Sequence, residues 1–401
     1  GWELRAVQPL ALSEARATTP PSAPFDSAPR VAVRETGYAS WGSLRPHFWI
    51  PLALNAGEAG LFFGAATAGV DAVGRTEYFA QALVSGSPGP LRAAGSLFII
   101  SRALGDPTLD LAVSNDWSLV GIDSTGHAVS AQRRDGALGA TVLAHRWRSF
   151  VSLRVAAEYE GRRYVSIPDT TLADICTGCD NRDRVGGSAS LAIGSAVSAP
   201  LAVSLQDGAT VNLLYRHKEE QGSPRWLNEV RGRGSLYARF GPRIGFAYPV
   251  LALRAAVGAM DGPIVDRLSV GGVSSGAVEV GFGQALGTLR TFPVRGYASG
   301  ALHGRRAATI SAEYRVPLSL VGRSLGHLPL GADKFAFALF GDIGDAWDVG
   351  EQARLHRLRS VGAELIGDLT VSYDLPLRVR VGVAQPATGH LRGYVAFAAD
   401  F

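Results

Sequence analysis

Residues 272–276 (Gly-Val-Ser-Ser-Gly) match the Gly-x-Ser-x-Gly pattern that surrounds the nucleophile of many serine hydrolases. In those enzymes the serine lies on a sharp turn between a strand and a helix, where its hydroxyl is exposed to substrate. Here the pattern falls in a long loop between expected strands, and the chain is rich in glycine and serine. A chance match is therefore favoured over a catalytic serine.

The two cysteines, Cys176 and Cys179, form a Cys-Thr-Gly-Cys motif in a polar stretch. Such a pair could be a redox site or half of a zinc site, but no other zinc ligands follow and no βαβ pattern surrounds it. A local disulfide in an oxidising compartment is the favoured interpretation.

The remaining residues of catalytic type have no spacing that suits a shared site. The eight histidines are scattered without the paired spacing of metal ligands. Asp342 and Asp345 lie three positions apart, so on a strand they point to opposite faces. The sequence therefore predicts no enzyme, no metal site and no cofactor.

The residues around these motifs follow a two-residue period. From Arg306 to Val316 the even positions are mostly apolar and the odd positions mostly polar, as in an extended strand with one oily face. The chain is 401 residues long, 47% hydrophobic and contains 49 glycines. It has no run near the roughly 18 apolar residues that a membrane-spanning helix requires.

The polar face is rich in arginine and carboxylates, which suits a watery lumen better than a dry core. We therefore predict an all-β protein, a 16-stranded antiparallel transmembrane β-barrel, in preference to a soluble sandwich or propeller. The formal net charge is only +4, and no compact basic patch indicates nucleic acid as a partner.

Two regions are expected, residues 1–57 and residues 58–401. The first is proline-rich and aperiodic, and it predicts an extended periplasmic tether that ends in a segment at the mouth of the barrel. The prolines at positions 46 and 51 argue against a central strand there. The sequence does not open on a signal peptide, so we expect either that an export signal has been removed or that the chain continues upstream in its precursor.

Sixteen strands are expected in the second region. They are 58–69, 75–86, 91–102, 108–120, 125–134, 136–146, 149–161, 186–197, 206–218, 226–239, 246–259, 305–319, 334–347, 357–373, 375–385 and 391–401. An even number places both ends of the barrel on the same side of the membrane. With a periplasmic N-terminus, the long loops 161–186 and 261–304 fall outside the cell. The short turns after Val84, Arg146, Ser198 and Tyr373 fall inside, and the connection 320–332 is longer than expected.

Five segments in this order resemble the BamA/TamA superfamily of outer-membrane assembly and secretion barrels. They are Arg267–Gly272, Val294–Tyr297, Ala312–Leu318, Phe340–Trp347 and the last strand, which ends in Phe401. The resemblance is strongest over residues 246–401 and extends more weakly to the whole barrel.

The resemblance implies that the loop 260–304 folds back into the lumen. Arg295 would dock on Glu313 and Asp342, Gly296 would allow a tight backbone at the tip, and Tyr297 would stack on the inner wall. Strand parity agrees independently, because Glu313 lies on the polar face of its strand. The alternative is a solvated loop arginine.

The chain departs from the family pattern in one respect, because it has no room for the small repeated periplasmic domains that bind clients or partners. Autonomous insertase activity is therefore in doubt. Glycines weaken strand pairing, so a lateral seam between the first and last strands is expected, marked by Gly60, Gly64, Gly393 and Phe401.

Three functions remain open. The first is assembly or translocation of envelope proteins through an opening seam in the outer membrane of a Gram-negative cell. The second is a docking subunit of a larger complex, and the third is a passive pore. The expected partners are the lipid bilayer, other periplasmic or outer-membrane proteins and, in the first case, client membrane proteins.

Overall fold

The computed structural model describes residues 42–55, 61–86, 92–122, 128–165, 181–199, 201–264, 266–273, 291–324, 326, 330–371 and 375–398. All of these residues belong to one compact unit, residues 40–401. Among them no helix is long and apolar enough to cross a membrane.

The unit is built on a 16-stranded antiparallel sheet in which neighbours along the chain are neighbours in space. Its strands are β1 (Ile50–Asn55), β2 (Leu61–Val70), β3 (Thr76–Ser85), β4 (Ala93–Ser101), β5 (Thr108–Ile122), β6 (Ala128–Arg146), β7 (Ser149–Val165), β8 (Arg182–Gly194), β9 (Gly208–Glu220), β10 (Trp226–Arg239), β11 (Val250–Asp261), β15 (Arg306–Ser324), β16 (Leu330–Trp347), β17 (Leu358–Val371), β18 (Leu375–Pro386) and β19 (Arg392–Ala398). The predicted all-β class and the count of sixteen are confirmed.

The two-residue period sorts the side chains between the faces. On β7, Leu153 and Val155 are exposed while Glu158 and Glu160 are covered, and on β18, Val381 is half exposed while Arg378 and Arg380 are buried. Apolar side chains thus face outward and charged side chains face inward. This is the distribution of a sheet with lipid outside and a polar lumen inside.

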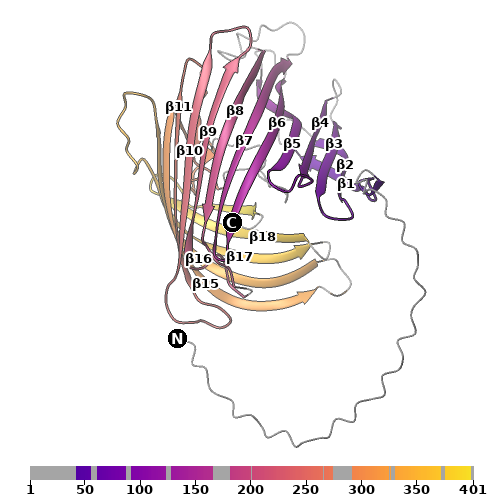
Figure 1. The fold of residues 1–401 in the computed structure, drawn as a ribbon. Coiled ribbons are helices and arrows are strands. Elements are labelled where there is room, and N and C mark those ends of the chain that lie inside the picture. The colour runs from indigo at the N-terminus through magenta and orange to yellow at the C-terminus, as the bar shows by residue number, and fades with distance from the viewer. Residues whose placement is uncertain are drawn as a thin grey trace, which may run out of the picture. The chain divides into compact units, whose positions relative to one another are not determined.

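The sheet curls, so that β15–β18 lie across the direction of β6–β11 (Figure 1). Its edges are β1 and β19, and no pairing between these two strands occurs among the described residues. We call the rim where β1 begins and β19 ends the terminal rim, and the opposite rim the loop rim.

The first strand was not expected. The prolines at positions 46 and 51 predict an extended mouth segment here, but Ile50–Asn55 pairs along its length with β2. Pro51 is tolerated because it is the second residue of an edge strand, where one side of the backbone makes no ladder. The sheet therefore begins before the expected boundary at residue 57.

The predicted strands 125–134 and 136–146 are one strand, β6. The break expected between them is position 135, but Asp135 lies within the ladder, opposite Ser114 on one side and Glu160 on the other. The sheet thus has one strand that was not predicted, β1, and one strand, β6, in place of two predicted ones, so the total remains sixteen. Because β1 comes first, the direction of β2 to β5 is the reverse of the expected one, so the connection after Val84 lies at the loop rim, not with the short inner turns.

The connection predicted at 320–332 is shorter than expected, since β15 continues to Ser324 and β16 begins at Leu330. The long connection between β11 and β15, residues 262–305, lies at the loop rim as predicted, and we call it the docked loop. Its described parts contain a small sheet of β12 (Leu268–Val270), β13 (Thr291–Phe292) and β14 (Leu302–Gly304).

Apolar side chains of the docked loop pack against the inner wall. Ile264, Leu268, Val270, Phe292 and Val294 are each at most 4% exposed. They form one cluster with inward residues of the wall strands, among them Met260 and Ala307. Burial of this cluster holds the loop inside the sheet and brings Arg295 to its position.

Candidate functional site

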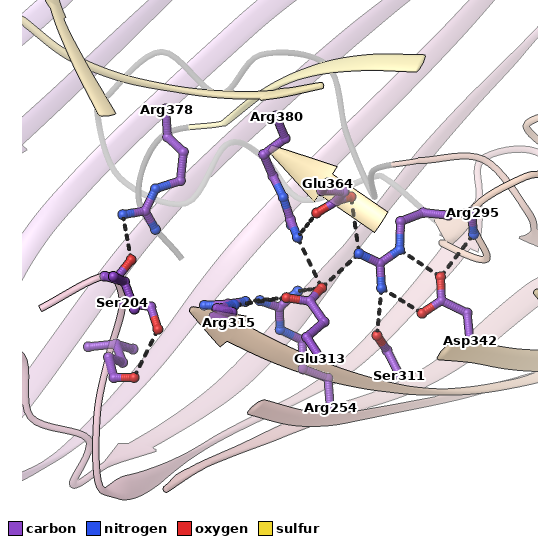
Figure 2. A network of polar contacts seen from close by, with 12 residues as sticks. Ser204, Arg254, Arg295, Ser311, Glu313, Arg315, Asp342, Glu364, Arg378 and Arg380 are labelled. Atoms are coloured by element: carbon purple, nitrogen blue, oxygen red, sulfur yellow. Dashed lines mark hydrogen bonds and ion pairs between the residues drawn. The ribbon is translucent and has the colours of Figure 1, made fainter. Parts of the chain in front are cut away.

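Arg295 lies at the tip of the docked loop, directly after the buried Val294. Val294 forms an isolated bridge with Gly272, and β13 pairs with β12 just before it. Backbone pairing of the residues directly before Arg295 therefore fixes the direction in which its side chain leaves the loop. It points to the inner face of β15–β18 (Figure 2).

The main partner of Arg295 is Asp342 of β16. The guanidinium donates from Nε to Oδ2 at 2.7 Å and from Nη2 to Oδ1 at 2.6 Å. The backbone N–H of Arg295 also donates to Oδ2, at 3.1 Å. This two-pronged geometry is the one in which an arginine binds a carboxylate most strongly.

The remaining donors of Arg295 reach two further strands. Nη1 lies 2.8 Å from Glu313 of β15 and 3.1 Å from Glu364 of β17. Nη2 also donates to the hydroxyl of Ser311 at 3.0 Å. The flat guanidinium lies over the Phe340 ring, with Cζ 3.5 Å from the ring centre. One side chain thus ties the loop to three adjacent strands.

Three more arginines balance these carboxylates. Arg315 donates to Glu313 at 2.9 and 2.6 Å, and Arg254 of β11 lies 3.3 Å from the same carboxylate. Arg380 of β18 bridges Glu313 and Glu364 (Figure 2). Because each carboxylate has a cationic partner, the cluster can be buried without an uncompensated charge.

The site holds Arg295 in its charged form. Burial alone would lower its pKa, but the hydrogen bonds to Asp342 and the charges of Glu313, Asp342 and Glu364 outweigh burial and raise the pKa well above its ordinary value. The docking interaction therefore persists through the pH range in which the carboxylates are ionised.

Gly296 and Tyr297 complete the tip. Gly296 has a φ of +88°, and a Cβ placed there would lie 3.1 Å from Cβ of Ala384 on β18. Tyr297 donates from its hydroxyl to the carbonyl of Arg359 on β17, at 3.0 Å. At position 296, glycine is thus required both by the backbone conformation and by the close approach of β18.

A second ion pair ties the base of the docked loop to the opposite part of the sheet. Asp266 accepts from Nη1 of Arg184 on β8 at 2.7 Å, and both side chains are nearly fully buried. Arg184 also lies 3.6 Å from Glu160 and 3.8 Å from Glu220. The loop is therefore fastened to the wall at β8 and, through Arg295, to the wall at β15–β17.

The structure brings together Arg295, Gly296, Tyr297, Glu313 and Asp342, the five residues expected at the docking site. Four further members of the cluster are not predicted from the sequence, namely Glu364, Arg380, Arg315 and Arg254. Strand parity carried a signal for them, because all four lie at inward positions of their strands. The pair of Asp266 and Arg184 is not predicted either, because the two residues are 82 positions apart and share no sequence pattern.

Of the four residues expected at the lateral seam, only Gly393 and Gly64 lie within the described part of the chain. Gly393 lies on the edge strand β19, opposite Val383. Gly64 lies on β2, one strand inward from the edge, where a Cβ would be 1.9 Å from the carbonyl oxygen of Ala82. It therefore permits a close backbone approach and is not an edge residue, which corrects its assignment to the seam. Gly60 and Phe401 lie outside the described residues.

Two other motifs also fall outside the part of the chain that the structure describes. They are the cysteine pair, Cys176 and Cys179, and the serines of the Gly-x-Ser-x-Gly pattern, of which only Gly272 and Val273 are described. Asp345, three residues after Asp342, is buried beside the β16–β17 connection and accepts from the backbone N–H of Arg354 at 2.7 Å.

Comparison with solved structures finds the same fold. BamA from Haemophilus ducreyi lacking POTRA domains 1–3 matches with a TM-score of 0.51 at 12% identity, over 87% of this chain and 68% of that one. CdiB from Acinetobacter baumannii matches with a TM-score of 0.50 at 12% identity, over 82% of this chain and 53% of that one. The chain thus spans about half the length of CdiB.

No protein-family model and no curated protein matches the sequence. The expected similarity to BamA-type barrels is confirmed at the level of the fold.

Proposed function

We propose that this protein is an outer-membrane β-barrel of the assembly and translocation type, which aids the insertion or export of envelope proteins. The observation that carries the proposal is the docking of Arg295 on carboxylates of three adjacent strands inside the sheet. The fold similarity to BamA and CdiB supports it.

The proposed location is the outer membrane of a Gram-negative bacterium, with the lipid bilayer around the outward face. The support is the row of apolar outward side chains, such as Leu138, Leu153, Leu236 and Leu339, which are 47–61% exposed. In water such a face would be an aggregation hazard, whereas lipid would cover it.

We infer that the terminal rim faces the periplasm and the loop rim faces outward. The longest connection of the sheet, the docked loop, leaves from the loop rim, as expected for outer-membrane barrels. Residues before β1 would then be a periplasmic tether. Client binding would be supplied by another envelope protein or by a segment beyond this sequence.

The proposed activity uses the seam between β1 and β19. Both edge strands are short, at 6 and 7 residues, so few ladder hydrogen bonds hold either edge. A client strand could add to a free edge by main-chain hydrogen bonding, as in other cases of strand addition. Opening this edge would allow a nascent barrel strand to move sideways into the bilayer.

The test is a disulfide across the seam. In a Cys176→Ser/Cys179→Ser background, Leu52→Cys on β1 is paired in turn with cysteines at positions 393–396 of β19. The oxidised protein is reconstituted in vesicles and assayed for folding of a small eight-stranded outer-membrane barrel. Oxidation is expected to abolish the stimulation and reduction to restore it.

The matched control is Phe63→Cys with Val84→Cys, which are opposed positions on β2 and β3 and similarly exposed. This disulfide leaves the seam free and should leave activity intact. Full activity with the seam locked would refute the proposed mechanism.

A passive pore is the competing function. The docked loop argues against it, because Arg295 and its apolar neighbours occupy the space that ions would cross. Single-channel recording of the intact chain separates the two, since a passive pore conducts without any change to the loop.

A further inference from the structure

The connection between β8 and β9, residues 195–207, lies at the terminal rim, where the sequence predicts a short turn after Ser198. Instead, Ala202 and Val203 are 2% exposed and Ser204 is 5% exposed. Side chains of a rim connection are normally exposed. Burial at this level shows that the connection folds away from the rim and into the curled sheet, and we call it the inner segment.

The surfaces that bury the inner segment belong to the inward face of distant strands. Val203 lies in one apolar cluster with Tyr237 of β10 and with Val250 and Ala252 of β11. The same cluster includes Ala336 and Ala338 of β16 and Ile366 of β17. The segment thus reaches from the β8–β9 hairpin to β16 and β17, which are five and six strands beyond β8 in the sheet.

Charged side chains fasten the backbone of the inner segment to the far wall. Nζ of Lys334 donates to the carbonyl of Ala202 at 2.5 Å. Nη2 of Arg378 donates to the carbonyl of Val203 at 3.4 Å, beside Ser204 in Figure 2. Asp368 of β17 holds both donors, at 2.6 Å from Arg378 and 3.5 Å from Lys334.

These contacts adjoin those of Arg295 along the same strands. On β16 the inward positions 334, 336 and 338 contact or surround the inner segment, and positions 340 and 342 hold Arg295. On β18, Arg378 binds the inner segment, while Arg380 belongs to the Arg295 cluster. The two segments therefore lie end to end along the inner wall.

We propose that the lumen is closed twice in series, by the docked loop from the loop rim and by the inner segment from the terminal rim. Each closure has its own contacts, so loss of one leaves the other in place. This inference concerns passage through the lumen, and it does not depend on the lateral seam or on a client protein.

The two closures differ in what holds them. The docked loop is fastened by a buried cluster of arginines and carboxylates, whereas the inner segment is held by an apolar cluster and by two side-chain bonds to its backbone carbonyls. Because backbone carbonyls do not depend on side-chain identity, conservative changes within residues 202–204 should leave the inner closure in place. A sequence motif would therefore not reveal it.

The test is single-channel conductance of four forms of the full chain in planar bilayers. They are the unmodified protein, a form lacking residues 285–304, a form with residues 198–205 replaced by glycine and serine, and a form with both changes. The series closure predicts that only the last form conducts as an open channel. If deletion of residues 285–304 alone gives the conductance of the double variant, the inner segment does not seal and the proposal is wrong.

A second measurement applies even if the double variant fails to fold. In the Cys176→Ser/Cys179→Ser background, Ser204→Cys is compared with Ser198→Cys, which lies in the same connection but at an exposed position. A bulky maleimide should modify position 204 at least about tenfold more slowly, because it must wait for local opening. Equal rates would overturn the proposal.

Discussion

The wall formed by β15–β18 and the wall formed by β1–β4 differ in both length and charge. Strands β15–β18 are 12 to 19 residues long, and they carry the carboxylates and arginines that hold the docked loop. Strands β1–β4 are 6 to 10 residues long, and Glu77 is their only charged residue.

This difference shows where the sheet can open at least cost. Removing one partner from a buried ion cluster leaves uncompensated charge and is strongly destabilising. Separating a short apolar edge strand breaks only a few hydrogen bonds, which water or a client strand can replace. We therefore expect the wall at β15–β18 to be the fixed side in the proposed mechanism, and β1–β4 to be the side that moves.

The largest effect is expected from Arg295→Ala. The change leaves Glu313, Asp342 and Glu364 without their shared cation, which should lower the free energy of unfolding by about 3–5 kcal/mol. Urea unfolding in lipid vesicles measures this loss, and limited proteolysis should show cleavage within the docked loop. The control is Arg267→Ala in the same loop. Arg267 pairs with Asp348, but the two side chains are 52% and 38% exposed, respectively. This pair should contribute at most about 1 kcal/mol to the free energy of unfolding. Similar losses from both changes would contradict the proposed role of Arg295.

The next effect tests the second anchor of the docked loop. Asp266→Asn removes the charge that faces Arg184 at 2.7 Å in a buried site, and it should cost up to about 3 kcal/mol. Asp348→Asn is the matched control, since its partner Arg267 is exposed. The same unfolding assay separates them, and equal stabilities would show that the base of the loop needs no ion pair.

A smaller effect is expected at the tip of the loop. Gly296→Ala adds a methyl group 3.1 Å from Cβ of Ala384 at a φ of +88°. It should lower the free energy of unfolding by about 2 kcal/mol. Gly322→Ala has a φ of +55° but open space around it, so it should cost only about 1 kcal/mol of backbone strain. A loss at position 296 no larger than that at position 322 would mean that the tip is not packed against β18.

The smallest effect belongs to the other wall. Glu77→Gln on β3 removes a pair with Arg102 in which the side chains are 22% and 48% exposed. Such a pair contributes about 0–1 kcal/mol. A loss comparable to that of Arg295→Ala would remove the distinction between the two walls.

The sequence predicted most of the fold because the two-residue period is local. Alternation placed the inward and outward faces of the strands, and the order of five segments identified Arg295, Glu313 and Asp342. It failed where local rules compete with context. Pro51 argues against a strand, although proline is tolerated at the edge of a sheet. The break expected at position 135 does not occur, because Asp135 pairs with both neighbouring strands.

Contacts between distant parts of the chain could not be predicted from local patterns. Asp266 and Arg184 meet only because the sheet curls and the loop crosses its interior. Val203 falls in a short connection between two expected strands, and only the assembled inner wall explains its burial.

Hydrogen–deuterium exchange of the protein in lipid vesicles tests the contrast between the two walls most directly. Amides of β1, β2 and β19 should exchange faster than those of β15–β17, because the edge strands are short and the Arg295 cluster fixes the opposite wall. Equal protection of β1 and β16 would contradict the existence of a movable edge beside a fixed wall.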